Sequence, residues 1–158
     1  MAGVVVAAVA AAVLGAGQLG LLAGTPPTDL GVHGGQLKPP ASTPNSVSSQ
    51  AALHSGHPMQ QAAMVAPLPL RGTPAEAITR LRAVVQAMPG AQVVTQRDDY
   101  LYVQFSTRWL GFVDDAEFWA DPAAQAIQVR SASRLGASDL GVNRARIERI
   151  RTALGTAG

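Results

Sequence analysis

RSASRLGASDLGVNRARIERIR, residues 130–151, is the stretch from which the fold of this chain is worked out. It begins in an alternating segment typical of a strand and ends in a run with helical spacing, and Gly136 and Gly141 lie between the two. It holds six of the twelve basic residues, all arginine, and only two acids, Asp139 and Glu148. We therefore interpret the rest of the chain as a scaffold that presents this stretch.

A helix is expected over about residues 140–154. Ser138 and Asp139 are typical of a helix entry, and Asn143 is an alternative cap one turn later. Apolar residues at helical spacing predict a buried stripe of Ile147, Ile150 and Leu154, with a glycine as the stop. The same spacing puts three arginines on the solvated side, and these are Arg146, Arg149 and Arg151.

A second helix and four strands precede this stretch. Thr73 and Glu76 have the spacing of a capping box, and a helix is expected over 74–88, ahead of a Pro-Gly pair. Alternating segments predict strands in hairpin order at 93–95, 100–107, 111–119 and 126–131. The expected fold class is α+β, with a four-stranded, mostly antiparallel sheet, two amphipathic helices packed on it, and an apolar N-terminal helix before it. Residues 71–158 form the compact domain in this interpretation.

The register of the last hairpin is chosen so that its apolar residues share one face. Phe118 is expected opposite Ile127, and the same register brings Asp115 opposite Arg130 as a cross-strand ion pair on the other face.

Asp114 then lies on the core face of the sheet, where burying a carboxylate alone is too costly. We therefore expect Arg134 or Arg144, just beyond the strand, to be its partner.

Residues 1–28 contain no charged side chain. As a helix, the apolar run 3–24 measures about 33 Å, enough to cross a hydrocarbon core. Three interpretations stay open: an uncleaved membrane anchor, a cleaved export signal, and a wrongly assigned gene start or buried helix. The uncleaved anchor is favoured, and residues 1–28 are assigned as a membrane anchor or export signal. It predicts contact with a membrane through residues 3–24 and a soluble domain on the periplasmic or exported side.

Residues 29–70 are rich in Pro, Ser and Gln, and they predict extended chain. TPNSVSSQA, 43–51, is expected to form a turn whose serine hydroxyls cap backbone groups. A serine nucleophile is the alternative, without a GxSxG elbow. His54 and His57 are interpreted as loop histidines, because no cysteine or nearby carboxylate completes a metal site. MVAPLPL, 64–70, is expected to be an edge strand or clamp.

The composition excludes several classes of protein. There is no cysteine, which rules out disulfides, thiolate metal sites and cysteine nucleophiles. Aromatic residues make up only 4% and the net charge is +2, whereas nucleic-acid binders have a dense basic face with interleaved aromatics. We therefore expect no nucleic-acid partner, and we assign no cofactor, no metal and no catalytic residue.

Three segments together resemble a known family. They are PNSVSSQA at 44–51, FVDDAEF at 112–118 and the arginine-rich stretch at 130–151. In this order they are similar to the domain of unknown function family numbered 1499, over about residues 30–155. The resemblance implies a protein of bacterial envelope or plastid type, often with membrane segments, and no established activity. Many members have cysteine where this chain has Pro40 and Ser46, so no disulfide or metal is implied there.

The candidate residues for a ligand site or a structural network have carboxylate, guanidinium or short polar side chains. They are Asn45, Ser48, Asp114, Asp115, Arg130, Arg134, Asp139, Asn143 and Arg144. The favoured interpretation is an ion-pair network that locks the last helix to the sheet.

Two other interpretations stay open. One is a binding module for an anionic small molecule or lipid headgroup, on arginines and the amides near Ser138 and Asp139, or for an envelope protein partner. The other is a hydrolase-like enzyme with Asp114 or Asp115 as general base and arginine stabilising an anionic substrate. The sequence thus favours an uncharacterised envelope protein with a binding or structural role over an enzyme.

Overall fold

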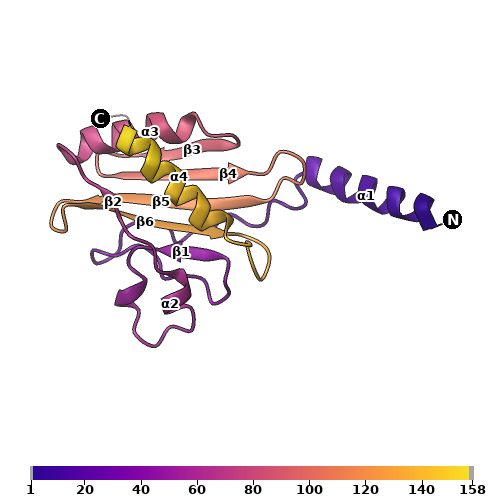
Figure 1. Ribbon diagram of the computed structural model, residues 1–158, viewed down its shortest axis with the longest axis horizontal. Helices are drawn as coiled ribbons and strands as arrows, with labels where there is room; N and C mark the ends of the chain where they lie inside the picture. Colours follow the sequence, from indigo (N-terminus) through magenta and orange to yellow (C-terminus); the bar gives the residue numbers. More distant parts are fainter. Residues whose placement is uncertain (1, 157–158) are drawn as a thin grey trace.

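The computed structural model describes residues 2–156 and has an α+β architecture (Figure 1). The helical elements are α1 (Ala2–Gln18), the short 3-10 helix η1 (Ala51–Leu53), α2 (Gln60–Ala63), α3 (Pro74–Gln86) and α4 (Val142–Thr156). The strands are β1 (Ser46–Ser48), β2 (Leu68–Pro69), β3 (Ala91–Gln96), β4 (Tyr100–Ser106), β5 (Val113–Asp121) and β6 (Ala126–Ser133).

The sheet has six strands, so the prediction of four was wrong in number. β3, β4, β5 and β6 form the expected antiparallel meander, and β1 and β2 both pair with the outer edge of β6. These two added strands have three and two residues, too few to give an alternating pattern. β2 lies within the segment 64–70, which was expected to be an edge strand.

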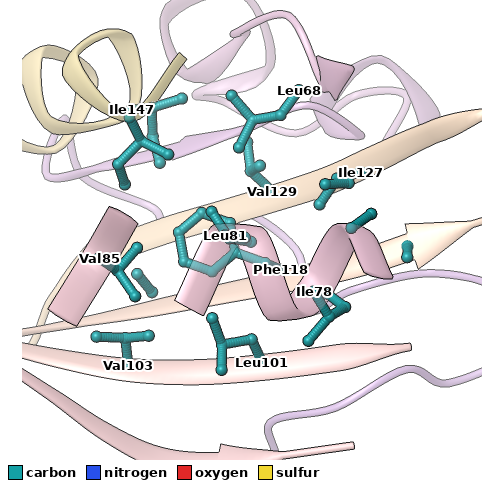
Figure 2. Close-up of a cluster of buried hydrophobic side chains, with 14 of the residues drawn as sticks. Leu68, Ile78, Leu81, Val85, Leu101, Val103, Phe118, Ile127, Val129 and Ile147 are labelled. Carbon is teal, nitrogen blue, oxygen red and sulfur yellow. The ribbon is translucent and has the colours of Figure 1, made fainter. Parts of the chain in front are cut away.

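α3 and α4 pack on one face of the sheet and close the main core (Figure 1). The predicted capping box is present, because the Thr73 hydroxyl accepts from the Glu76 amide and the Glu76 carboxylate accepts from the Thr73 amide. Figure 2 shows the apolar side chains that meet between the helices and the three central strands. Those that are fully buried include Ile78, Leu81, Val85, Leu101, Val103, Phe118, Val129, Ile147 and Ile150.

The opposite face of the sheet is covered by the chain that precedes β1. Leu37 is 2% exposed and packs against Tyr100 and Tyr102, with Leu30 and Trp119 at the margin. Because β4 is covered on both faces, its alternating tyrosines are buried along with its core residues. This second, smaller core encloses most of the polar groups described below.

The register of β5 and β6 differs from the prediction by two residues. Phe118 lies opposite Val129, and Asp115 lies opposite Ala132, so the expected Asp115–Arg130 pair was wrong. A shift of two residues leaves every side chain on its original face, because the period of a strand is two. The apolar pattern therefore chose the faces correctly but could not choose between these registers.

α1 projects away from the sheet (Figure 1). It ends at Gln18, so it does not fill the apolar run 3–24 that was expected to form one helix. Across residues 2–156, no helix combines the length and the apolar character that a membrane span requires.

The base of α1 is attached to the loop between β4 and β5. The Gln18 side-chain amide donates to the carbonyl oxygens of Arg108 and Trp109. Gly17 lies so close to this loop that a Cβ there would be 2.6 Å from the Leu110 carbonyl oxygen, and Gly111, at φ +65°, lies across the same contact. Only glycine fits at this contact, so it fixes where the helix leaves the domain.

Candidate functional site

Asp115 is held by two groups on the face covered by the N-terminal segment. The Arg134 guanidinium donates to both carboxylate oxygens, at 2.8 and 2.7 Å, and the Tyr102 hydroxyl donates to one of them at 2.5 Å. The Asp115 and Arg134 side chains are 3% and 6% exposed. This hydrogen bonding raises the pKa of Arg134, and burial raises the pKa of Tyr102. The pair is therefore bidentate and almost fully buried.

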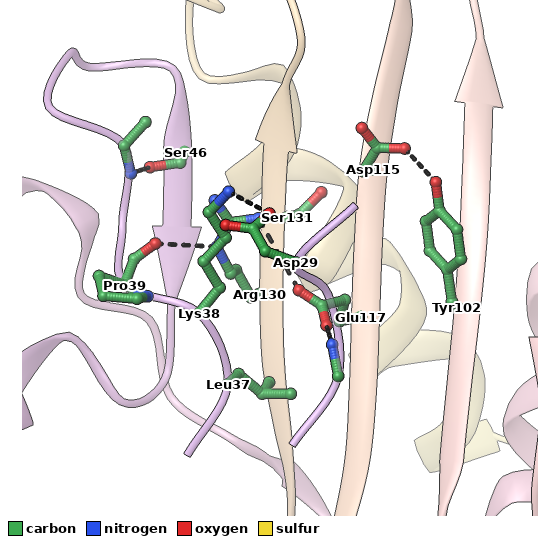
Figure 3. A network of polar contacts seen from close by, with 12 residues as sticks. Asp29, Leu37, Lys38, Pro39, Ser46, Tyr102, Asp115, Glu117, Arg130 and Ser131 are labelled. Carbon is green, nitrogen blue, oxygen red and sulfur yellow. Dashed lines mark hydrogen bonds and ion pairs between the residues drawn. The ribbon is translucent and has the colours of Figure 1, made fainter. Parts of the chain in front are cut away.

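Glu117 is the most buried carboxylate of the described chain, and it lies two positions after Asp115 on β5 (Figure 3). One of its oxygens accepts from the Gly31 amide and the Tyr100 hydroxyl, both at 2.7 Å. Its other oxygen has no hydrogen bond and lies 3.9 Å from the Arg130 guanidinium, which donates to the Pro39 carbonyl oxygen. Burial raises the pKa of Glu117 and lowers the pKa of Arg130, so desolvation outweighs the attraction between them.

Asp114 lies on the helix face and pairs with Arg146 of α4, at 2.5 Å. The predicted partners, Arg134 and Arg144, were both wrong, and so was the expected solvation of Arg146, which is only 8% exposed. The Arg146 guanidinium also donates to Asn143 at 2.7 Å and stacks over the Phe105 ring at 4.5 Å from its centroid. This pair is one direct link between α4 and the sheet.

Asp139 and Asn143 start α4 together. The Asp139 carboxylate accepts from the backbone amides of Gly141 and Asn143, so Asp139 is the cap and Asn143 is not. Burial opposes ionisation, but these hydrogen bonds outweigh it and lower the pKa of Asp139. The amides expected to hold an anionic ligand here are thus already occupied by Asp139.

The Asn143 side chain is fully buried and connects three segments. Its amide donates to the Asn45 carbonyl oxygen, Ser133 and Asp139, while its oxygen accepts from Ser131. The Asn45 side chain in turn donates to the Gly136 carbonyl oxygen at 2.8 Å. This cluster ties β1, β6 and α4 into one unit.

The remaining candidates contact backbone only. Arg144 donates to the carbonyl oxygens of Ala62 and Met64, so it holds the chain around α2 against α4. The Ser48 hydroxyl accepts from the Gln50 amide, as expected for a turn in which serines cap backbone groups.

Glu117, Arg146, Tyr100 and Tyr102 belong to these networks but were not singled out from the sequence. Arg146 had a signal, because it shares a helix face with Asn143, Ile147 and Ile150 at spacings of three and four. Glu117 had none, since its partner depends on the register and on a loop far away in the sequence.

A cavity of about 220 Å³ borders Asp114. Its walls are mainly apolar, from Phe112, Val113 and Leu135, with the hydroxyls of Ser133 and Ser138 at the side. Asp115 does not reach it and already accepts three hydrogen bonds. Of the two candidate general bases, only Asp114 is placed beside a space that a small molecule can enter.

Residues 2–156 contain no group of three His, Asp or Glu side chains that converge as ligands. His54 and His57 lie in the loop between η1 and α2.

Comparison with known proteins gives one match. A family model described as Protein of unknown function (DUF1499) matches residues 36–154, which is most of the chain and includes every strand. No curated protein and no solved structure matches the chain.

Proposed function

This chain belongs to the DUF1499 family of proteins of unknown function, and we propose that it is a non-catalytic binding domain held at a membrane by α1. The observation that carries the proposal is the surface of α1. Its large apolar side chains are 42–76% exposed, and they are Val4, Val5, Val6, Val9, Val13 and Leu14.

Lipid is the proposed environment of α1 because its exposed residues do not share one face. Consecutive positions on a helix point about 100° apart, so Val4, Val5 and Val6 already face three directions. A helix that is apolar all round needs an apolar environment on all sides, whereas a protein partner covers a single stripe. At the base of α1, Trp109 is 63% exposed with Arg108 stacked on its ring, a combination typical of a membrane interface.

The domain is placed on the periplasmic or exported side in this proposal. An apolar helix ahead of a folded domain is the arrangement through which chains are exported. The three buried carboxylate–arginine pairs then have a structural role, since each arginine is already held by a carboxylate, a carbonyl or both.

Flotation with phosphatidylcholine vesicles tests the attachment. The full chain is expected to float with the vesicles, and Val5→Asp/Val9→Asp is expected to stay behind, because each buried aspartate costs about 3 kcal/mol in a bilayer. Val94→Asp is the matched control, since Val94 is a 47% exposed valine of β3. Equal flotation of the double variant and the parent chain would refute the proposal.

A hydrolase that uses Asp114 is the second candidate, and the cavity beside that carboxylate favours it. Asp114→Asn would then keep the fold and abolish turnover of an ester or phosphoester substrate found by screening. A variant that loses only stability, with no turnover in the parent chain, contradicts this candidate.

A further inference from the structure

A second pocket, of about 310 Å³, lies between α4, the end of β4 and the turn after α3. Three arginines line it, Arg108, Arg146 and Arg149, together with the hydroxyl-bearing Ser106 and Thr107. Among the described residues that line it, none carries a carboxylate. We call it the arginine pocket.

Arg146 is the fixed part of the arginine pocket. Its guanidinium donates to Asp114 at 2.5 Å and to Asn143 at 2.7 Å, and it lies 4.5 Å from the centroid of the Phe105 ring. Asp114 neutralises one of the three guanidinium charges, which leaves two for a ligand. A phosphate monoester carries about −1.5 to −2 at neutral pH, so its charge matches this surplus.

Arg108 and Arg149 are the adaptable part. Both side chains are exposed, and within residues 2–156 neither one forms an ion pair with an acid. Arg149 follows Arg146 by three positions, so the two lie on neighbouring parts of the α4 surface. Guanidinium forks bind phosphate oxygens two at a time, which a compact ammonium does not do.

We propose that the arginine pocket binds a phosphate monoester group. The pocket adjoins the base of α1, because Arg108 is one of its lining residues and the carbonyl oxygen of Arg108 accepts from Gln18. A lipid headgroup at the membrane surface can therefore supply the phosphate, and so can a soluble phosphomonoester. The lipid source rests on the membrane attachment proposed above, but the chemistry of the pocket does not.

The test compares two charge-matched double variants of the full chain. Arg108→Gln/Arg149→Gln removes the adaptable arginines, and Arg71→Gln/Arg82→Gln removes two exposed arginines outside the pocket. One arm measures binding to phosphatidylcholine vesicles in which phosphatidic acid replaces about a tenth of the lipid. The other arm titrates glycerol 3-phosphate, by calorimetry, onto each protein in zwitterionic micelles. Thermal unfolding confirms that both variants keep their fold.

The parent chain is expected to prefer the vesicles with phosphatidic acid, and the pocket variant to bind them about 25-fold more weakly, at about fivefold per arginine. Loss of glycerol 3-phosphate binding in the pocket variant, without an effect on vesicles, supports the site but assigns it a soluble ligand. Equal losses in both variants, or binding in neither arm, overturn the proposal. If the parent chain binds no vesicle, only the attachment by α1 is contradicted, because the micelle arm tests the pocket separately.

Discussion

Arg134→Met is the substitution that tests most directly how the buried pairs stabilise the domain. The methionine keeps much of the apolar stem of Arg134 but removes both hydrogen bonds to Asp115, at 2.8 and 2.7 Å. The Asp115 side chain, which is only 3% exposed, then has no cation beside it. Charge-assisted hydrogen bonds contribute about 1.5–3 kcal/mol each, and breaking one side of a buried pair costs about 3–5 kcal/mol. We therefore expect the free energy of unfolding to fall by about 3–5 kcal/mol.

Urea unfolding followed by tryptophan fluorescence measures this loss. Trp119 packs in the second core beside Tyr100 and Tyr102, so its emission reports on the affected face. Arg82→Met is the matched control, since Arg82 is exposed on α3, and its effect should stay within about 0.5 kcal/mol. A loss below about 1 kcal/mol in Arg134→Met would show that the pair is not the strong contact described here.

The double variant Asp115→Asn/Arg134→Met separates the attraction of the pair from the cost of a stranded charge. Once the carboxylate is neutral, the unpaired charge disappears, so the double variant should lose less stability than the two single variants added together. The expected coupling free energy is about 2–3 kcal/mol. Simple additivity of the two losses contradicts the proposed direct pair.

Three further outcomes are expected. Burial raises the pKa of Glu117 above its ordinary value of 4.5, so between these two pKa values the folded state binds more protons than the unfolded state. As the pH rises through this range, the free energy of unfolding of the parent chain should therefore decline relative to that of Glu117→Gln. Urea midpoints of the two proteins across pH measure this difference, and parallel curves contradict it. Asp139→Ala removes the cap of α4 and should cost about 1–2 kcal/mol in the same assay, whereas no loss would mean that the helix start does not depend on this carboxylate. Gly17→Ala should loosen the attachment of α1 and speed proteolytic cleavage beside it. Gly15→Ala is the control and should have no such effect, because a Cβ at Gly15 meets nothing within 4 Å. Equal cleavage rates in the two variants would refute the close contact.

Local features of the fold could be predicted from the sequence because they depend on neighbours along the chain. The Thr73–Glu76 capping box, the order of the four long strands and the inward faces of β5 and β6 were all confirmed. Each rests on a spacing of two, three or four residues, which a sequence shows directly. The same reasoning identified the buried stripe of α4, with Ile147 and Ile150.

Pairings between distant segments could not be predicted in this way. Two registers of β5 on β6 bury the same apolar side chains, and the observed one places Glu117 opposite Arg130. That choice depends on polar partners such as Gly31 and Pro39, which belong to a segment whose composition predicted only extended chain. Asp114 and Asp115 are therefore joined to other arginines than the ones the sequence predicted.

The alternation of carboxylates along β5 has a consequence for how this sequence can change over time. Asp114 points to one layer of the domain, and Asp115 and Glu117 point to the other, each toward its own arginine. A single substitution in any pair leaves a buried charge without its partner. The two members can therefore be replaced only together, or through a single variant of lower stability. Neutral variation should therefore accumulate around these positions while each acid and its arginine are kept or replaced together, as covarying couples.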